Sequence, residues 1–119
     1  MEREISPLGV QQTQWKGDRM VATRGLTEAL VRRGAQHIIL FGSLAAGEGS
    51  VGSDSDVDLV VVMPGIEDTR FHRRLADVEE VQRFPYPLDL VVYSPREWEE
   101  IQERGFVRQE ILKRGVILH

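Results

Sequence analysis

The stretch GSLAAGEGSVGSDSDVDLVVV, residues 42–62, carries the clearest signals of fold and function in the chain. It starts rich in glycine and serine, continues with aspartates at alternate positions (Asp54, Asp56 and Asp58), and ends in a run of valines. A run of β-branched residues closed by Pro-Gly is typical of a buried strand, so residues 57–63 predict one. Glycine-rich loops often cradle phosphates, and here acids follow directly. The stretch therefore points to phosphate chemistry beside a buried strand.

The flanking sequence predicts the other elements by hydrophobic spacing and by helix start and stop signals. We expect helices over residues 18–33, 67–82 and 106–113, a helix after Ser94, and further strands over 37–41 and 88–93. The order is helix, strand, strand, helix, strand, helix, helix. It predicts an α/β (α+β) domain in which a small mixed sheet is packed with helices.

Two of these segments allow more detailed expectations. Ser94 with Pro95 and Glu97 has the pattern of a capped helix start, and Trp98 should then be buried. The arginines of the 67–82 helix (Arg70, Arg73 and Arg74) fit a solvated helix face. We expect an irregular segment over residues 1–16 and the folded domain over 17–119.

Composition excludes several classes of function. The chain has 119 residues, a net charge of −4 and no cysteine. An acidic balance argues against general nucleic-acid binding, and the lack of cysteine excludes disulfides, thiolate catalysis and zinc–sulfur sites. No apolar run is long enough to span a membrane, and the first residues lack the apolar core of a signal peptide. We therefore expect no membrane association and a cytoplasmic location.

Two familiar phosphate-binding patterns are present only in part. GEGSVG, residues 47–52, matches G-x-G-x-x-G, but a strand and not a helix follows it, which excludes the dinucleotide fingerprint. Gly42 and Gly47 have the spacing of a P-loop, yet Glu48 and Gly49 stand where that loop needs Lys and then Ser or Thr. Neither pattern explains the stretch.

The aspartates are better explained by a metal site. Asp58 lies inside the apolar run and Asp56 at its edge, although aspartate is disfavoured in strands and neighbouring carboxylates repel. Asp89 lies in a second apolar run, residues 88–93. If the two strands are neighbours, the three carboxylates converge, as in a two-metal site for in-line phosphoryl displacement.

These residues together resemble a known family. Phe41-Gly42-Ser43, then Gly47, then Ser55-Asp56-Val57-Asp58, and a later strand aspartate, Asp89, are similar to the pattern of the nucleotidyltransferase superfamily that includes DNA polymerase β. The short chain resembles its minimal nucleotidyltransferase branch, and the similarity extends from about residue 20 onward. It implies the polymerase β-like nucleotidyltransferase fold.

The resemblance also implies roles for individual residues. Asp56 and Asp58 would hold two Mg²⁺ ions, and Asp89 would ligate the catalytic ion and help to activate an acceptor hydroxyl. Gly42 and Ser43 would contact the triphosphate of ATP or another NTP. The nucleotide site would also include Gly47 and Ser55. The implied reaction moves a nucleoside monophosphate, with AMP as our first choice, from the NTP to a hydroxyl and releases pyrophosphate.

The metal ligands can be assigned in two registers. The spacing from Gly42 to Asp56 is longer than the resemblance implies, and the usual spacing would place the motif at Ser53-Asp54-Ser55-Asp56. We prefer Asp56 and Asp58, because Val57 and the valines that follow fit a strand. Asp54 with Asp56 stays open as the rival pair.

The acceptor is expected to come from outside the domain. Minimal nucleotidyltransferases resemble the antitoxin of a two-gene pair whose partner is an all-helical HEPN-domain protein, and some are thought to adenylylate that partner. The acceptor would then be the partner or would lie across a homodimer interface. The alternative is a catalytically weak or inactive antitoxin that acts by binding. Ala46, where many members carry a basic residue, favours that alternative.

Overall fold

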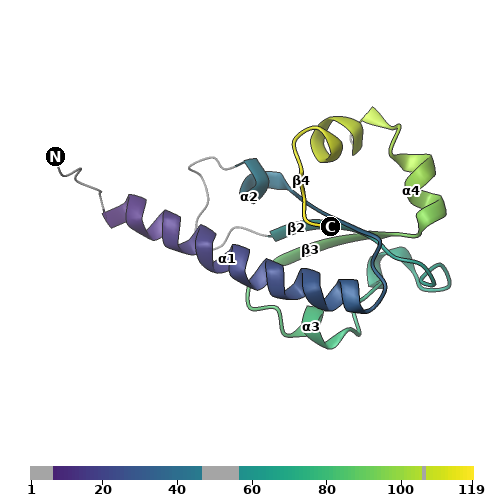
Figure 1. The fold of residues 1–119 in the computed structure, drawn as a ribbon, viewed down its shortest axis with the longest axis horizontal. Helices are drawn as coiled ribbons and strands as arrows, with labels where there is room; N and C mark the ends of the chain where they lie inside the picture. Colours follow the sequence, from purple (N-terminus) through teal and green to yellow (C-terminus); the bar gives the residue numbers. More distant parts are fainter. Residues whose placement is uncertain (1–6, 47–56, 106) are drawn as a thin grey trace.

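The computed structural model describes residues 7–46, 57–105 and 107–119, which form a mixed sheet with helices on both faces (Figure 1). In chain order the elements are α1 (Pro7–Arg32), β1 (His37–Phe41), α2 (Gly42–Ala46), β2 (Val57–Val62), the 3₁₀ turn η1 (Phe71–Arg73), α3 (Glu79–Gln82), β3 (Leu88–Tyr93), α4 (Pro95–Ile101), the π-helical segment η2 (Val107–Leu112) and β4 (Val116–Ile117).

The sheet has four strands in the order β3-β2-β1-β4. β2 pairs in parallel with β3 and antiparallel with β1, and β1 pairs antiparallel with β4. The predicted fold class, a small mixed sheet packed with helices, is therefore confirmed. The three strands expected from the sequence all form, because their β-branched and aliphatic runs fill both faces of the sheet.

α1 begins earlier than the sequence indicated. It starts at Pro7, so the irregular segment expected over residues 1–16 is wrong from Pro7 onward. Proline is tolerated in the first turn of a helix, where its missing N–H needs no partner. The N-terminal end of α1 runs past the sheet (Figure 1). Its other end stops as predicted at Gly34, which has φ +108° and lets the Ala35 N–H reach the Leu30 carbonyl at 3.0 Å.

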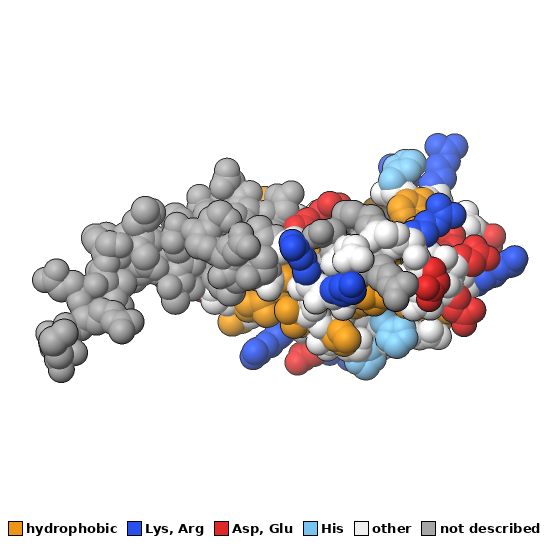
Figure 2. Space-filling view, turned by 90° about the horizontal axis from the view of Figure 1, so that it is seen from above, with side chains coloured by type: hydrophobic (Ala, Val, Ile, Leu, Met, Phe, Trp, Pro, Cys, Tyr) orange, Lys and Arg blue, Asp and Glu red, His pale blue; other side chains and the backbone are white. Residues whose placement is uncertain are grey.

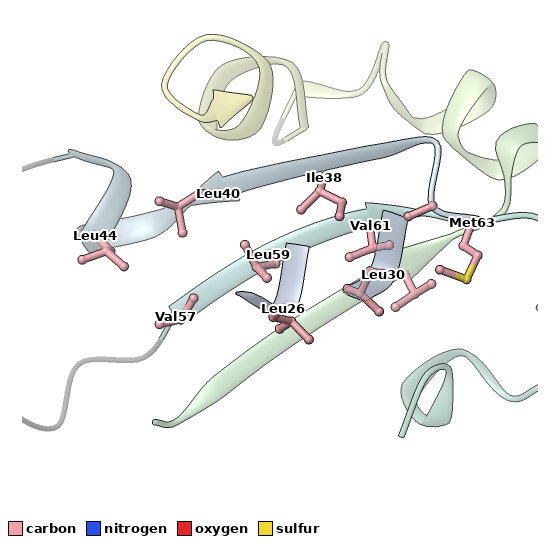
Figure 3. Packing of buried hydrophobic residues seen from close by; sticks show 11 residues of the cluster. Leu26, Leu30, Ile38, Leu40, Leu44, Val57, Leu59, Val61 and Met63 are labelled. Carbon is pink, nitrogen blue, oxygen red and sulfur yellow. The ribbon is translucent and has the colours of Figure 1, made fainter. Parts of the chain in front are cut away.

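Strand alternation divides the core into two clusters, one on each face of the sheet. On one face, Leu26 and Leu30 of α1 pack against Leu59 and Val61 of β2 (Figure 3). On the other, α4 and η2 cover the sheet through the buried residues Ile39, Val60, Val62, Trp98, Val107 and Ile111. The valines of β2 are buried on both faces, which explains why the strand reads as one continuous apolar run.

The helix predicted over residues 67–82 is wrong. The segment contains only the η1 turn and the single short turn of α3. Arg74 has an extended backbone, and Leu75 has φ +65°, a left-handed conformation that interrupts any right-handed helix. Arg74 is buried and not part of a solvated face.

The C-terminal part begins as predicted. Ser94 accepts a hydrogen bond from the Glu97 N–H, the Glu97 side chain accepts one from the Ser94 N–H, and Trp98 is buried. The helix expected over 106–113 is a π-helical segment over Val107–Leu112. β4, which the sequence did not reveal, returns along β1.

Candidate active site

Asp58 and Asp89 lie side by side on the sheet. They are register partners in the parallel pair of β2 and β3, and their neighbours Val57 and Leu88 are partners too. Adjacent strands are about 5 Å apart, and partners in a parallel pair project from the same face. Asp58 is half-buried and Asp89 is exposed. The expectation that the two aspartate-bearing strands are neighbours is confirmed.

Gly42 completes this corner from the strand on the other side. Phe41 of β1 is the register partner of Asp58, and Gly42 follows it with φ +76° at the start of α2. A Cβ on Gly42 would collide with the Asp58 carboxylate, since the Asp58 Cγ would lie only 3.0 Å away. Glycine is needed here both for its backbone conformation and for the space that the carboxylate occupies.

The carboxylates project from the sheet face that α4 and η2 cover. Asp58 alternates with Val60 and Val62, which belong to the cluster of that face. The two aspartates stand near the start of their strands, whereas α4 packs near the other end, beside Tyr93. The sheet thus carries hydrophobic residues under its helices and acids at one end of the same face.

The starts of β2 and β3 are fixed by the loop before β3. The Val57 N–H donates a 2.8 Å hydrogen bond to the Pro87 carbonyl. Tyr86 packs its ring against the guanidinium of Arg19, whose Cζ lies 4.4 Å from the ring centroid. Arg19 is buried in α1, with 1% of its surface exposed. Sequence reasoning missed this contact, because no local pattern links residues so far apart in the chain.

At the opposite end of β3, Arg74 joins the loop segment to α4. Its guanidinium donates to both Glu97 carboxylate oxygens, with Nη2 at 3.0 Å from Oε2, and to the Val92 carbonyl at 3.1 Å. Hydrogen bonds from Arg74 and from the Ser94 N–H lower the pKa of Glu97 to about 2. Burial, with the nearby Glu97 charge, raises the pKa of Tyr93. These contacts hold β3 and α4 together but lie away from the aspartates.

The remaining predicted site residues are only partly visible. Ser43 follows Gly42 in the backbone of α2, while Gly47, Ser55 and Asp56 lie outside the described residues, as does Asp54. Within the described ranges, no three acidic or histidine side chains gather into a metal-binding group. The pair of Asp58 and Asp89 offers two carboxylates, the hard oxygen donors that magnesium prefers.

A comparison with protein families agrees with this geometry. The family model described as nucleotidyltransferase domain matches residues 24–118. The chain belongs to the nucleotidyltransferase domain family. The match runs from α1 through β4 and includes Gly42, Asp58 and Asp89. The resemblance seen in the sequence is therefore confirmed at the level of the family.

A solved structure shows the same fold. The crystal structure of a candidate nucleotidyltransferase from Sulfolobus solfataricus superposes with a TM-score of 0.58 at 18% sequence identity. The alignment covers 98% of this nucleotidyltransferase domain and 89% of the other chain. At that identity the likeness shows the fold alone. A search among curated proteins gave no match.

The surface of the nucleotidyltransferase domain carries mixed charge. On the side shown in Figure 2, Lys and Arg side chains are interspersed with Asp and Glu rather than gathered into one basic face. None of the helices in the described part of the chain is long and apolar enough to cross a membrane.

Proposed function

We propose that this domain transfers a nucleoside monophosphate, AMP from ATP in the first instance, to a hydroxyl group of a partner protein. The observation that carries the proposal is the pairing of Asp58 with Asp89 beside Gly42, in a chain of the nucleotidyltransferase domain family. Two register-paired carboxylates repel each other, and a bound divalent cation relieves that repulsion.

The residues divide into a metal site and a phosphate site. Asp58 and Asp89, with Asp56, would hold two Mg²⁺ ions. When bound, such ions neutralise the phosphate oxygens and supply the electrostatic stabilisation of an in-line displacement. Gly42 and Ser43 would approach the triphosphate from the turn after β1, with Gly47 and Ser55 completing that site. The missing side chain of Gly42 keeps the Asp58 carboxylate and the phosphate-binding turn close together.

The reaction that we propose conserves all atoms. The acceptor hydroxyl oxygen forms a bond to the α-phosphorus of the NTP, and the bond from that phosphorus to the α–β bridging oxygen breaks. Pyrophosphate leaves with the bridging oxygen, and the hydroxyl proton is lost to solvent. Asp89, the more exposed of the two carboxylates, would orient and activate the hydroxyl.

The first experiment measures thermal unfolding with magnesium, ATP, both or neither. Ligand at a hundred times its dissociation constant stabilises a protein by about 2.7 kcal/mol, which is a shift on the order of 10 °C for a domain of this size. We expect such a shift only with magnesium and ATP together, and none in the variant Asp56→Asn/Asp58→Asn. The absence of any shift at millimolar ATP in the wild type would contradict a nucleotide site.

A labelling experiment then tests the transfer itself. The domain is incubated with magnesium and a cognate all-helical partner of the HEPN type, using ATP labelled at either the α- or the γ-phosphate. Nucleotidyl transfer labels the partner from α-labelled ATP only, whereas phosphoryl transfer would label it from γ-labelled ATP only. Failure to label the partner from either nucleotide would overturn the proposed acceptor.

A second candidate function is neutralisation of the partner by binding alone. Ala46 favours it, because it stands where a basic residue would help to hold the triphosphate. Under this alternative, Asp58→Asn and Asp89→Asn leave neutralisation of the partner unchanged. Under the proposed transferase function, both substitutions abolish it. A growth assay with the partner co-expressed separates the two outcomes.

A further inference from the structure

A groove lies at the β4 edge of the sheet, between that strand and α1. It has a volume of about 270 Å³. Its lining residues are Arg24, Thr27, Glu28, Ile117 and Leu118. The groove belongs to a different part of the molecule from the aspartates, which lie on β2 and β3.

One polar group in this groove has no partner. Thr27 is only 9% exposed, and its Oγ1 makes no hydrogen bond within the described part of the chain. A buried hydroxyl without a partner costs free energy. Because that oxygen is itself covered by the protein, the surface that Thr27 presents to the groove comes from its other atoms.

The strand beside the groove has an open edge. β4 is the last strand of the sheet, and the Leu118 N–H donates inward to the Ile38 carbonyl at 2.8 Å. Because backbone groups alternate in direction along a strand, those of Ile117 face the open side. The Ile117 side chain is 74% exposed. An edge with free backbone groups and an exposed apolar residue is suited to pairing with another strand.

Two charged residues on α1 bear on which molecule supplies the strand that pairs with β4. Arg24 and Glu28 are exposed one helical turn apart, and neither forms an ion pair with any described residue. A two-fold axis perpendicular to the sheet at β4 would keep both copies of α1 on one side, in antiparallel orientation. Both residues line the groove beside β4, so an axis that passes between them would set Arg24 of each copy opposite Glu28 of the other. The surface around Arg24 and Glu28 is therefore complementary in charge to a second copy of itself.

We propose that this edge binds a second copy of the chain. β4 pairs antiparallel with β4 of the second copy, so the two sheets join into one, and the two α1 helices lie on the same face of the joined sheet. The second copy fills the groove and forms both arginine–glutamate contacts. This proposal goes beyond the proposed nucleotide transfer and does not rest on it.

Sedimentation equilibrium on the full chain over a series of concentrations tests the association. We expect a reversible species of twice the 13.5 kDa chain mass. Ile117→Lys, which puts a charge in the paired edge, should weaken the dimer by at least about tenfold, which corresponds to 1.4 kcal/mol. A chain that stays monomeric at the highest concentration reached overturns the proposal and leaves the edge for a different protein.

Charge exchange provides the decisive control. Arg24→Glu alone and Glu28→Arg alone should each be monomeric, because each places like charges across the axis. An equimolar mixture of the two should form heterodimers, and the double variant Arg24→Glu/Glu28→Arg should form homodimers again. Arg73→Glu, a reversal at an exposed arginine on η1, should leave the dimer unchanged. If the single variants still form dimers on their own, or if they fail to form dimers when mixed, this edge is not the interface.

Discussion

The Asp58 carboxylate lies between Asp89 and the Cα of Gly42. Asp89 is the register partner of Asp58 on β3, and Gly42 directly follows Phe41, the register partner of Asp58 on β1. Three segments far apart in the sequence therefore meet at one corner of the sheet. The strand that joins them, β2, is buried on both faces, so the corner rests on a strand that is packed from both sides.

The position of Asp58 favours the metal pair Asp56 and Asp58 over Asp54 and Asp56. Asp58→Asn should abolish the magnesium-dependent thermal shift with ATP, because it removes the carboxylate that faces Asp89. Asp54→Asn should retain the shift. Isothermal titration of magnesium into the ATP-bound protein gives an independent measure. The reverse pattern, with Asp54→Asn inactive and Asp58→Asn unaffected, would assign the site to the rival register.

Gly42→Ala should destabilise the protein more than an alanine at a glycine that shares only its backbone conformation. Gly65 offers a matched control, because it has a similar φ of +80° but open space around its Cα. Gly65→Ala should cost about 1–2 kcal/mol from the left-handed conformation alone. Gly42→Ala should cost about 1–3 kcal/mol more, because the new methyl group displaces the Asp58 carboxylate. Urea unfolding measures both, and equal losses would show that the carboxylate has room to move.

Glu97 should make stability fall in acid. Its pKa in the folded protein is about 2, below the ordinary 4.5, so its contribution is complete above pH 4.5 and is lost as the pH falls toward 2. Glu97→Gln should lower the free energy of unfolding at neutral pH by about 1–3 kcal/mol, since Arg74 loses a charged acceptor. We expect a loss at the low end of this range, because 37% of the Glu97 side chain is exposed and solvent weakens its interaction with Arg74.

The pH dependence of the free energy of unfolding separates the contribution of Glu97 from the stability that other groups lose in acid. Between pH 4.5 and 2, the wild type should lose more stability than Glu97→Gln, so the two curves converge. Glu79→Gln is the control, because its ion pair with Arg83 is exposed on both sides and should change stability by less than about 0.5 kcal/mol. Parallel curves for the wild type and Glu97→Gln would contradict the assignment.

Tyr86 should stabilise the protein through its ring rather than its hydroxyl. Tyr86→Leu removes the ring that lies over the Arg19 guanidinium and should cost about 0.5–2 kcal/mol. Tyr86→Phe keeps the ring and should be nearly neutral. Denaturant unfolding of the two variants is the measurement, and similar losses in both would assign the effect to the hydroxyl.

The sequence predicted those parts of the fold that depend on local chemistry. The valine run of β2, the second apolar run of β3 and the Ser94–Glu97 capping box each specify their element within a few residues. The pairing of Asp58 with Asp89 followed from one assumption, that the two apolar strands that each carry an aspartate are neighbours. That assumption is confirmed.

The parts that failed depend on distant contacts. Arg74 lies within a helical pattern of apolar residues, yet its guanidinium binds Glu97 and the Val92 carbonyl, and the backbone turns to allow it. Leu75 then takes a conformation that no propensity predicts. β4 has two residues and gains its hydrogen bonds only when η2 has brought it back to β1, so its sequence carries no strand signal. Gly42 appeared only as a phosphate contact, and its packing against Asp58 is a tertiary property.

The bond from Arg74 to the Val92 carbonyl also limits how the protein can polymerise. The Tyr93 carbonyl accepts from Met63 beside β2, so the preceding carbonyl, that of Val92, faces outward, where the buried guanidinium occupies it. A neighbouring molecule that approached β3 would have to expel an arginine before it could form a backbone bond there. Sheets with two open edge strands can join edge to edge into fibres, whereas a sheet with one blocked edge can pair with only one other sheet. Arg74→Ala should accordingly increase fibril formation under mildly destabilising conditions.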